Sequence, residues 1–201
     1  MIKAIIFDYG NVISRVDHSL FLKRIASLSA HPLSALQKMA SGQPKLLVDY
    51  ENGWITSAEF YRDAVEKYGL AISQTDFRNA FIDIFERIQP TIQLIKQLKP
   101  RYKIGLLSNT NEWHYEAQIK TVEVFPLFDT ITTSFEVGAM KPDEKIYRDA
   151  LGKLALPPDT CMYIDDIGEY VEAAQRVGMH AVQYTTPDAL LLALKTAGVN
   201  V

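Results

Sequence analysis

The 201-residue sequence has little of several features that mark particular classes of protein. Its single cysteine, Cys161, permits no disulfide within the chain and gives no sign of an oxidising compartment. No apolar run approaches the roughly 20 residues needed to cross a bilayer, and the apolar run at the amino terminus is too short for a signal-peptide core. We therefore expect a cytoplasmic protein with no membrane partner.

An excess of positive charge is also missing. Lys and Arg number 21 against 24 Asp and Glu, which gives a formal net charge of −3. Because a chain without a cationic field does not gather nucleic acid, we expect no nucleic-acid partner. Hydrophobic residues make up 48% and charged residues 22%, which excludes the disordered and fibrous classes. Nothing in the sequence indicates an oligomer, and a monomer is the default expectation.

Short apolar runs typical of buried parallel strands occur five times along the chain. From Lys103 onward each run is followed by a helical pattern. This alternation predicts an α/β fold with a Rossmann-like parallel sheet and helices on both of its faces. The predicted strands are 4–7, 104–107, 130–133, 162–164 and 181–184, and the predicted helices are 112–120, 143–154, 170–177 and 189–197.

The segment of residues 15–91 shows helix signatures and no convincing strand. Thr56 begins a capping box for a helix that Gly69 ends, and Ser73 begins a second helix. The apolar face predicted for this second helix consists of Phe77, Phe81, Ile84 and Ile88. We predict a Rossmann-like catalytic core of residues 1–14 and 92–201 and an all-helical cap domain of residues 15–91. Inserted after the first strand, the cap would lie over the strand ends where α/β sheets bind ligands.

Polar residues follow four of the predicted strands at that same edge of the sheet. They are Asp8, Ser108, Lys141 and the pair Asp165 and Asp166. A carboxylate nucleophile, a hydroxyl, an ammonium group and a carboxylate pair are the groups that phosphoryl transfer through an aspartyl phosphate requires. Three carboxylates in one place would repel one another unless a cation joined them. Since Mg²⁺ prefers oxygen ligands, it is the expected cofactor.

These residues lie in segments that resemble the four motifs of the haloacid dehalogenase (HAD) superfamily, in the family order. The segments are Asp8-Tyr9-Gly10-Asn11-Val12, Leu107-Ser108-Asn109-Thr110, Gly138-Ala139-Met140-Lys141-Pro142-Asp143-Glu144-Lys145-Ile146-Tyr147 and Tyr163-Ile164-Asp165-Asp166. The resemblance implies that the cap is inserted after the first motif. Its first motif, Asp-x-Gly-Asn-Val, is similar to that of a subgroup that includes sugar-1-phosphate phosphatase-like proteins.

The resemblance also implies roles for individual residues. Asp8 would be the nucleophile, and Ser108 and Lys141 would hold the phosphoryl group. The implied Mg²⁺ ligands are Asp8, Asp165, Asp166 and the main-chain carbonyl of Gly10. The substrate-binding residues assigned by the resemblance are Gly10, Asn11 and Asn109.

Two positions depart from the family pattern. Gly10 stands where phosphatases of the family usually have an Asp that acts as general acid and base, and Tyr170 stands where an Asn or Asp often steadies the metal-site loop. Gly10 favours substrates whose leaving oxygen needs little protonation, such as the anomeric oxygen of a sugar 1-phosphate. His18 and His114 are candidates to replace the missing acid, because histidine titrates near neutral pH.

The leading prediction is a Mg²⁺-dependent phosphomonoester hydrolase that acts on a small phosphorylated metabolite, for example a sugar phosphate. Two alternatives stay open: a metal-free 2-haloacid dehalogenase, in which Asp8 would attack carbon, and a non-catalytic phosphate-ester-binding protein with the family fold. The physiological substrate is not predictable, because it depends on cap loops such as residues 48–54. Trp54 and Trp113 are interpreted as packing anchors or as part of the cap interface.

Overall fold

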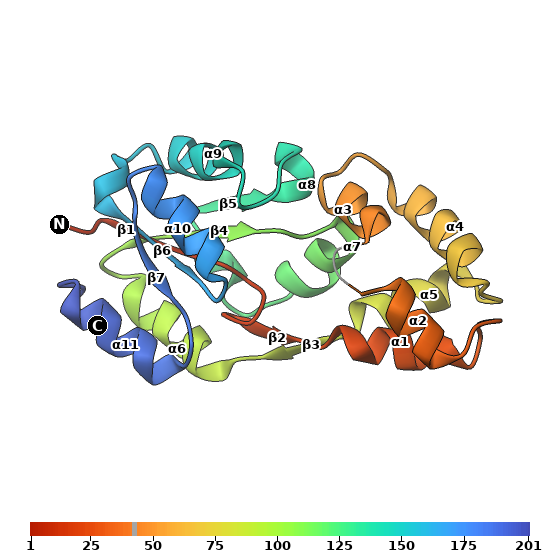
Figure 1. Cartoon of the computed structure of the whole chain (residues 1–201). Helices are drawn as coiled ribbons and strands as arrows, with labels where there is room; N and C mark the ends of the chain where they lie inside the picture. The colour runs from red at the N-terminus through yellow and green to blue at the C-terminus, as the bar shows by residue number, and fades with distance from the viewer. Residues whose placement is uncertain (42–43) are drawn as a thin grey trace.

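The computed structural model describes residues 1–41 and 44–201. Five parallel strands form one sheet in the order β5-β4-β1-β6-β7, and β1 occupies its centre (Figure 1). The strands are β1 (Ala4–Phe7), β4 (Lys103–Ser108), β5 (Thr130–Thr133), β6 (Cys161–Asp165) and β7 (His180–Gln183). Each predicted strand is present with its ends shifted by no more than one residue, so the α/β prediction is confirmed.

Helices cover both faces of this sheet, because successive strand residues point to opposite sides. Ile5 and Phe7 of β1 pack in one apolar cluster with residues of α6 (Gln89–Leu98) and α11 (Pro187–Thr196). Ala4 and Ile6 belong to a second cluster with residues of α9 (Glu144–Leu154) and α10 (Gly168–Arg176). Figure 1 shows these two helix pairs on opposite sides of the strands. Burial on both faces explains why the strands read as continuous apolar runs.

A second group of helices lies at one end of the molecule, beyond the sheet (Figure 1). Its helices are α1 (His18–Ala26), α2 (Leu33–Met39), α3 (Lys45–Glu51), α4 (Ser57–Tyr68) and α5 (Gln74–Ile82). The predicted caps are confirmed: Thr56 forms a capping box with Glu59, Gly69 ends α4 at a φ of +57°, and Ser73 caps α5. Helices this short are not stable alone in water, and they are held together by an aromatic cluster around Phe60.

The prediction of an all-helical insertion is wrong in one respect. β2 (Ser14–Val16) and β3 (Phe85–Arg87) form an antiparallel ribbon at the two ends of the insertion. Strands of three residues are too short to show a period-2 pattern, and their partners lie about 70 residues apart in the sequence. The predicted helix face after Ser73 is also shorter than expected, because α5 ends at Ile82 and the chain then continues into β3.

The remaining elements connect the sheet to its helices. The predicted helix 112–120 is α7 (Glu112–His114), which continues directly as a π-helix (Tyr115–Ile119). The others are α8 (Ser134–Val137) and the 3-10 turns Phe125–Leu127 and Pro158–Thr160. The boundary predicted between residues 91 and 92 falls inside α6, which packs on the sheet, and the division into domains stays a prediction.

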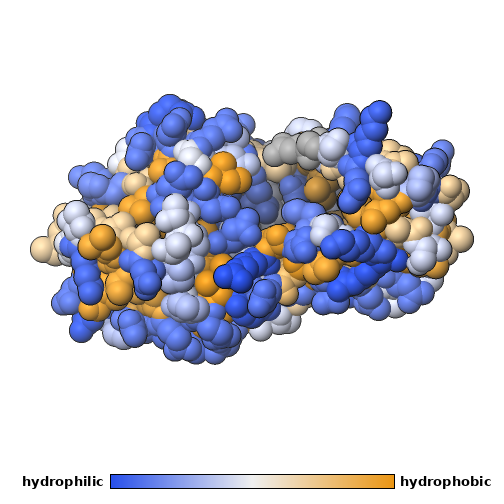
Figure 2. Space-filling model, turned by 60° about the horizontal axis from the view of Figure 1, so that its bottom comes forward, coloured by the Kyte–Doolittle hydropathy of each residue, from blue (hydrophilic) through white to orange (hydrophobic). Residues whose placement is uncertain are grey.

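The cap helices are bound to the sheet half through α7 and α8. Trp113 of α7 is buried in the aromatic cluster of the cap, and its backbone N–H donates to the Tyr50 hydroxyl at 3.2 Å. The Ser134 hydroxyl of α8 donates to the carbonyl of Glu51 at 2.5 Å. Trp113 is therefore the packing anchor that was predicted, whereas Trp54 is 65% exposed and is not a buried anchor, and its alternative place in the cap interface stays a prediction. Figure 2 shows the two halves as separate lobes that meet at a narrower waist.

Among the residues that the structure describes, none of the helices has both the length and the apolar character needed to cross a bilayer.

Candidate active site

The polar residues predicted at the strand ends come together at the edge of the sheet that faces the cap. Asp8 follows β1, Ser108 and Asp165 are the last residues of β4 and β6, and Lys141 lies in the loop after α8. A cavity of about 190 Å³ opens between this edge and the cap, and Asp8, Ser108 and Lys141 line it together with Asp166. Parallel strands end at one edge, and this is what brings together residues that are far apart in the sequence.

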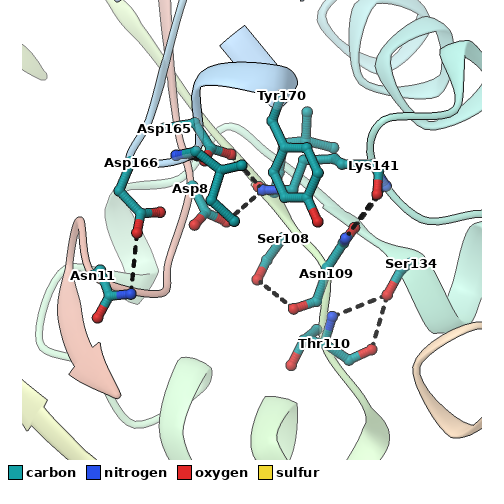
Figure 3. A network of polar contacts seen from close by, with 12 residues as sticks. Asp8, Asn11, Ser108, Asn109, Thr110, Ser134, Lys141, Asp165, Asp166 and Tyr170 are labelled. Carbon is teal, nitrogen blue, oxygen red and sulfur yellow. Dashed lines mark hydrogen bonds and ion pairs between the residues drawn. The ribbon is translucent and has the colours of Figure 1, made fainter. Parts of the chain in front are cut away.

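Lys141 is the centre of this cluster (Figure 3). Its buried Nζ lies 2.7 Å from Oδ1 of Asp8 and 2.7 Å from Oδ2 of Asp165, and it donates to the Tyr163 hydroxyl at 2.9 Å. Burial lowers the pKa of Lys141, but the two carboxylates more than offset this effect, so its pKa stands above the ordinary value. The ring of Tyr170 covers the ammonium group at 5.0 Å from its centroid. Lys141 is therefore held as a cation beside the nucleophile candidate.

The three aspartates form a group of oxygen ligands. One carboxylate oxygen each of Asp8, Asp165 and Asp166 lies within 4.8 Å of the other two. Burial raises the pKa of Asp8, Lys141 opposes the rise, and the charge of Asp165 adds to it. Burial also raises the pKa of Asp166. Carboxylates crowded in this way favour a bound divalent cation, and the all-oxygen set fits Mg²⁺.

Two residues predicted to bind substrate hold other parts of the site in place. Asn11, at a φ of +53°, donates from Nδ2 to Oδ2 of Asp166 at 3.1 Å and accepts from the Val16 N–H at 3.2 Å. The side chain of Asn109 accepts from the backbone N–H of Lys141 at 2.8 Å and donates to its carbonyl at 3.1 Å. These contacts orient Asp166 and Lys141. Direct contact of Asn11, Asn109 or Gly10 with substrate stays a prediction, as does metal binding by the Gly10 carbonyl.

The two histidines proposed as substitutes for the missing acid differ in their surroundings. His114 is buried, its ring nitrogens lie 3.0 Å from Nδ2 of Asn111 and 3.1 Å from the carbonyl of Phe81, and its ring stacks on Phe81. Burial lowers the pKa of His114 to about 3, so at neutral pH the ring is neutral and lacks the acidic proton of an imidazolium. This burial and the partners at both ring nitrogens argue against His114 as the general acid. His18, the first residue of α1, lines the cavity, and burial lowers its pKa.

Sequence reasoning missed two residues of the site. Tyr163 lies behind Lys141 and hydrogen-bonds the Asp165 carboxylate. It stands two residues before Asp165 in β6, and this spacing, which places both on one face of a strand, was the available signal. Glu51 reaches the cavity from the end of α3 in the cap. No motif singled it out, since its place depends on how the cap docks on the sheet.

Known proteins are similar to this chain along almost its full length. The D-ribitol-5-phosphate phosphatase of Bacteroides thetaiotaomicron is 24% identical over 192 residues, which cover 91% of this chain and 92% of that protein. Drimenol cyclase drtB of Aspergillus calidoustus is 24% identical over 195 residues, or 94% of this chain, but the match covers only 35% of that longer protein.

A crystal structure and a family profile agree with this similarity. A HAD family enzyme from Bacteroides thetaiotaomicron, crystallised with magnesium and inorganic phosphate, has the same fold, with a TM-score of 0.83, 22% identity, and coverage of 92% of this chain and 95% of that one. The profile of the haloacid dehalogenase-like hydrolases matches residues 2–178. This match spans four of the five strands of the sheet, the cap and all four strand-end motifs, and the chain therefore belongs to the haloacid dehalogenase-like hydrolase family.

Proposed function

We propose that the protein is a Mg²⁺-dependent phosphomonoester hydrolase that acts on a small phosphorylated metabolite through an aspartyl phosphate. The observation that carries the proposal is the buried cluster in which Lys141 lies between Asp8 and Asp165, 2.7 Å from each, at the floor of the cavity. The cluster sets three carboxylates against one ammonium group, that of Lys141, and the remaining repulsion favours a further cation, which a metal-free dehalogenase would not hold.

The residues of the cavity suit a two-step displacement at phosphorus. A carboxylate oxygen of Asp8 attacks the phosphorus atom, and the ester P–O bond breaks as the new bond forms. The ammonium group of Lys141 neutralises charge on the phosphoryl oxygens, and the Ser108 hydroxyl donates a hydrogen bond to one of them. Water then attacks the same phosphorus atom and releases phosphate and free Asp8. Mg²⁺ held by Asp8, Asp165 and Asp166 would supply further charge neutralisation.

The relatives support a small substrate. One relative is named for a phosphatase of D-ribitol 5-phosphate, a phosphorylated sugar alcohol. The cavity of about 190 Å³ holds a phosphate group and a few further atoms, so the rest of such a substrate would extend towards the cap. A phosphorylated sugar or sugar alcohol is therefore the proposed substrate class. The cytoplasmic location and the monomeric state stay predictions from the sequence.

The proposal is tested by phosphate release from a panel of sugar phosphates, sugar-alcohol phosphates, nucleotides and 4-nitrophenyl phosphate, with Mg²⁺ or with EDTA. We expect release that requires Mg²⁺ and is lost in Asp8→Asn, while Asp159→Asn, at an exposed position, keeps it. Silence across the panel, or release that persists in Asp8→Asn, would refute the proposal. Chloride release from 2-chloropropionate in EDTA would establish the dehalogenase instead.

A further inference from the structure

A second cavity adjoins the one over Asp8. It has a volume of about 300 Å³, lies among the cap helices, and is lined mostly by apolar side chains, of which Phe21, Leu47 and Phe77 are examples. Among the described residues, only His18 and Glu51 line both cavities. An ester bound with its phosphate over Asp8 and its organic part in the cap has its bridging oxygen where the cavities meet. His18 and Glu51 therefore lie at the boundary from which a side chain could reach the bridging oxygen of such an ester.

The backbone of Glu51 is fixed to the sheet half of the molecule. Glu51 ends α3, and its carbonyl accepts the hydrogen bond from Ser134 of α8 at 2.5 Å. Two residues later, Gly53 adopts a φ of +67° so close to α8 that a Cβ there would lie 2.2 Å from the carbonyl oxygen of Phe135. These contacts fix the position of the Glu51 backbone relative to the sheet, so its side chain starts from a defined point at the edge of the cavity.

The surroundings of the Glu51 carboxyl suit proton transfer near neutral pH. Burial raises its pKa to about 7, and the charge of Lys141 opposes the rise. Among the described residues, no side chain forms a hydrogen bond or ion pair with this carboxyl. Several titratable groups line the two cavities that Glu51 faces: Asp8, Tyr9, His18, His114, Lys141, Asp166 and Tyr170 in the cavity over Asp8, and Tyr68 with His18 in the cap cavity.

Gly10 leaves the reaction without the acid that the family usually carries at this position. The backbone does not require a glycine here for lack of room, because a Cβ at Gly10 would lie 3.6 Å from Cγ2 of Val16 and 3.8 Å from Oδ2 of Asp8. Both distances are ordinary van der Waals contacts. There is therefore room for a Cβ at Gly10. Since Gly10 has no carboxyl, a proton for the leaving oxygen of the ester must come from another residue of the cavity.

We propose that Glu51 is the general acid and base of the hydrolase, supplied by the cap in place of the residue missing at Gly10. The inference rests on the proposed phosphatase function. In the first step the Glu51 carboxyl gives its proton to the bridging oxygen as the bond from Asp8 to phosphorus forms and the ester P–O bond breaks, so the leaving group departs as a neutral alcohol. In the second step the Glu51 carboxylate takes a proton from the attacking water as the bond between phosphorus and Asp8 breaks.

Leaving groups of different basicity test this role. An alkyl phosphate needs a proton on its departing oxygen, whereas 4-nitrophenol leaves as a stable anion. In Glu51→Gln we expect kcat/KM for the best alkyl phosphate of the panel to fall about 10²–10⁴-fold and kcat/KM for 4-nitrophenyl phosphate to fall less than about tenfold. The decline of wild-type alkyl phosphate hydrolysis above about pH 7 should disappear in the variant.

Three further variants make the result specific. Gly10→Asp in the Glu51→Gln background should restore part of the alkyl phosphate activity, because there is room for a Cβ at Gly10 and the substitution returns a carboxyl to the site. His18→Gln, at the other residue shared by the two cavities, should not produce the dependence on leaving group. Glu66→Gln, at an exposed position of α4, should keep wild-type activity.

Several outcomes would overturn the inference. Equal losses on both substrates in Glu51→Gln would show a role in folding or binding, and unchanged alkyl phosphate activity would show no role. A dependence on leaving group in His18→Gln alone would assign the acid to His18. Wild-type protein that hydrolyses neither substrate would refute the phosphatase function itself, whereas wild-type activity that Glu51→Gln leaves intact would refute only the inference.

Discussion

Replacing Glu51 with glutamine is expected to stabilise the protein at alkaline pH and to change its stability little at acid pH. The pKa of Glu51 is about 7 in the folded protein, against an ordinary value of 4.5. Below about pH 4.5 the carboxyl is protonated in both the folded and the unfolded chain, so its ionisation contributes nothing. Between pH 4.5 and 7 the folded chain binds more protons than the unfolded chain, and stability falls as the pH rises.

The size of the effect follows from the difference between the two pKa values. At about 1.36 kcal/mol per pH unit, the interval from 4.5 to about 7 corresponds to about 3 kcal/mol lost by the wild type above pH 7. The side chain of Glu51 is only half-buried and faces an open cavity, so about 3 kcal/mol is an upper bound on this loss of stability. We expect Glu51→Gln to gain about 1–3 kcal/mol over the wild type between pH 4.5 and 8.5.

The assay is urea unfolding followed by far-UV circular dichroism at pH 4.5, 6 and 8.5, in EDTA throughout. Glu66→Gln is the matched control, since it removes a carboxylate from an exposed position of the same group of helices. Its difference from the wild type should not change with pH by more than about 0.5 kcal/mol. If the advantage of Glu51→Gln does not grow between pH 4.5 and 8.5, Glu51 is solvated in the folded protein and the reasoning fails.

Three further predictions concern packing and burial. Trp113→Ala should lower the free energy of unfolding by about 3–5 kcal/mol in urea, because its ring fills the core shared by the cap and α7; a loss under 1 kcal/mol would contradict this. The ring of His114 should stay neutral down to about pH 3 in an NMR titration, because burial lowers its pKa. The stability that this neutral ring contributes is complete above about pH 6.5 and is lost as the pH falls toward 3. Titration of the ring near pH 6.5 would refute its burial. Gly53→Ala should lower the free energy of unfolding by more than about 1 kcal/mol. Gly152→Ala, with nothing within 4 Å of the added Cβ, should raise it by about 0.5–1 kcal/mol. Equal effects of the two substitutions in thermal unfolding would contradict the predicted contact at Gly53.

The fold and the cluster of candidate site residues were predictable because both depend on local pattern and on one rule of topology. Strands buried on both faces read as apolar runs, and the capping residues Thr56, Gly69 and Ser73 mark helix ends through contacts within a few residues. Parallel strands end at the same edge, so Asp8, Ser108 and Asp165 could be placed together without knowing any distance.

The errors arose where the outcome depended on contacts between distant segments. The ribbon of β2 and β3 pairs Arg15 with Glu86, and neither three-residue strand carries a pattern of its own. Trp54 and Trp113 are the same residue type, but one is 65% exposed and the other is buried in the cap cluster. No local signal in the sequence distinguishes them.

The sequence by itself therefore determined the parallel sheet, the inserted helices and the set of residues that phosphoryl chemistry would use. Only the tertiary structure decided which groups can move a proton in that site. In the folded protein His114 is buried against Phe81, which lowers its pKa to about 3, and Glu51 at the end of α3 lines the cavity over Asp8. The physical reason is that the proton affinity of a side chain depends on its burial and on its charged neighbours, and the docking of the cap on the sheet sets both.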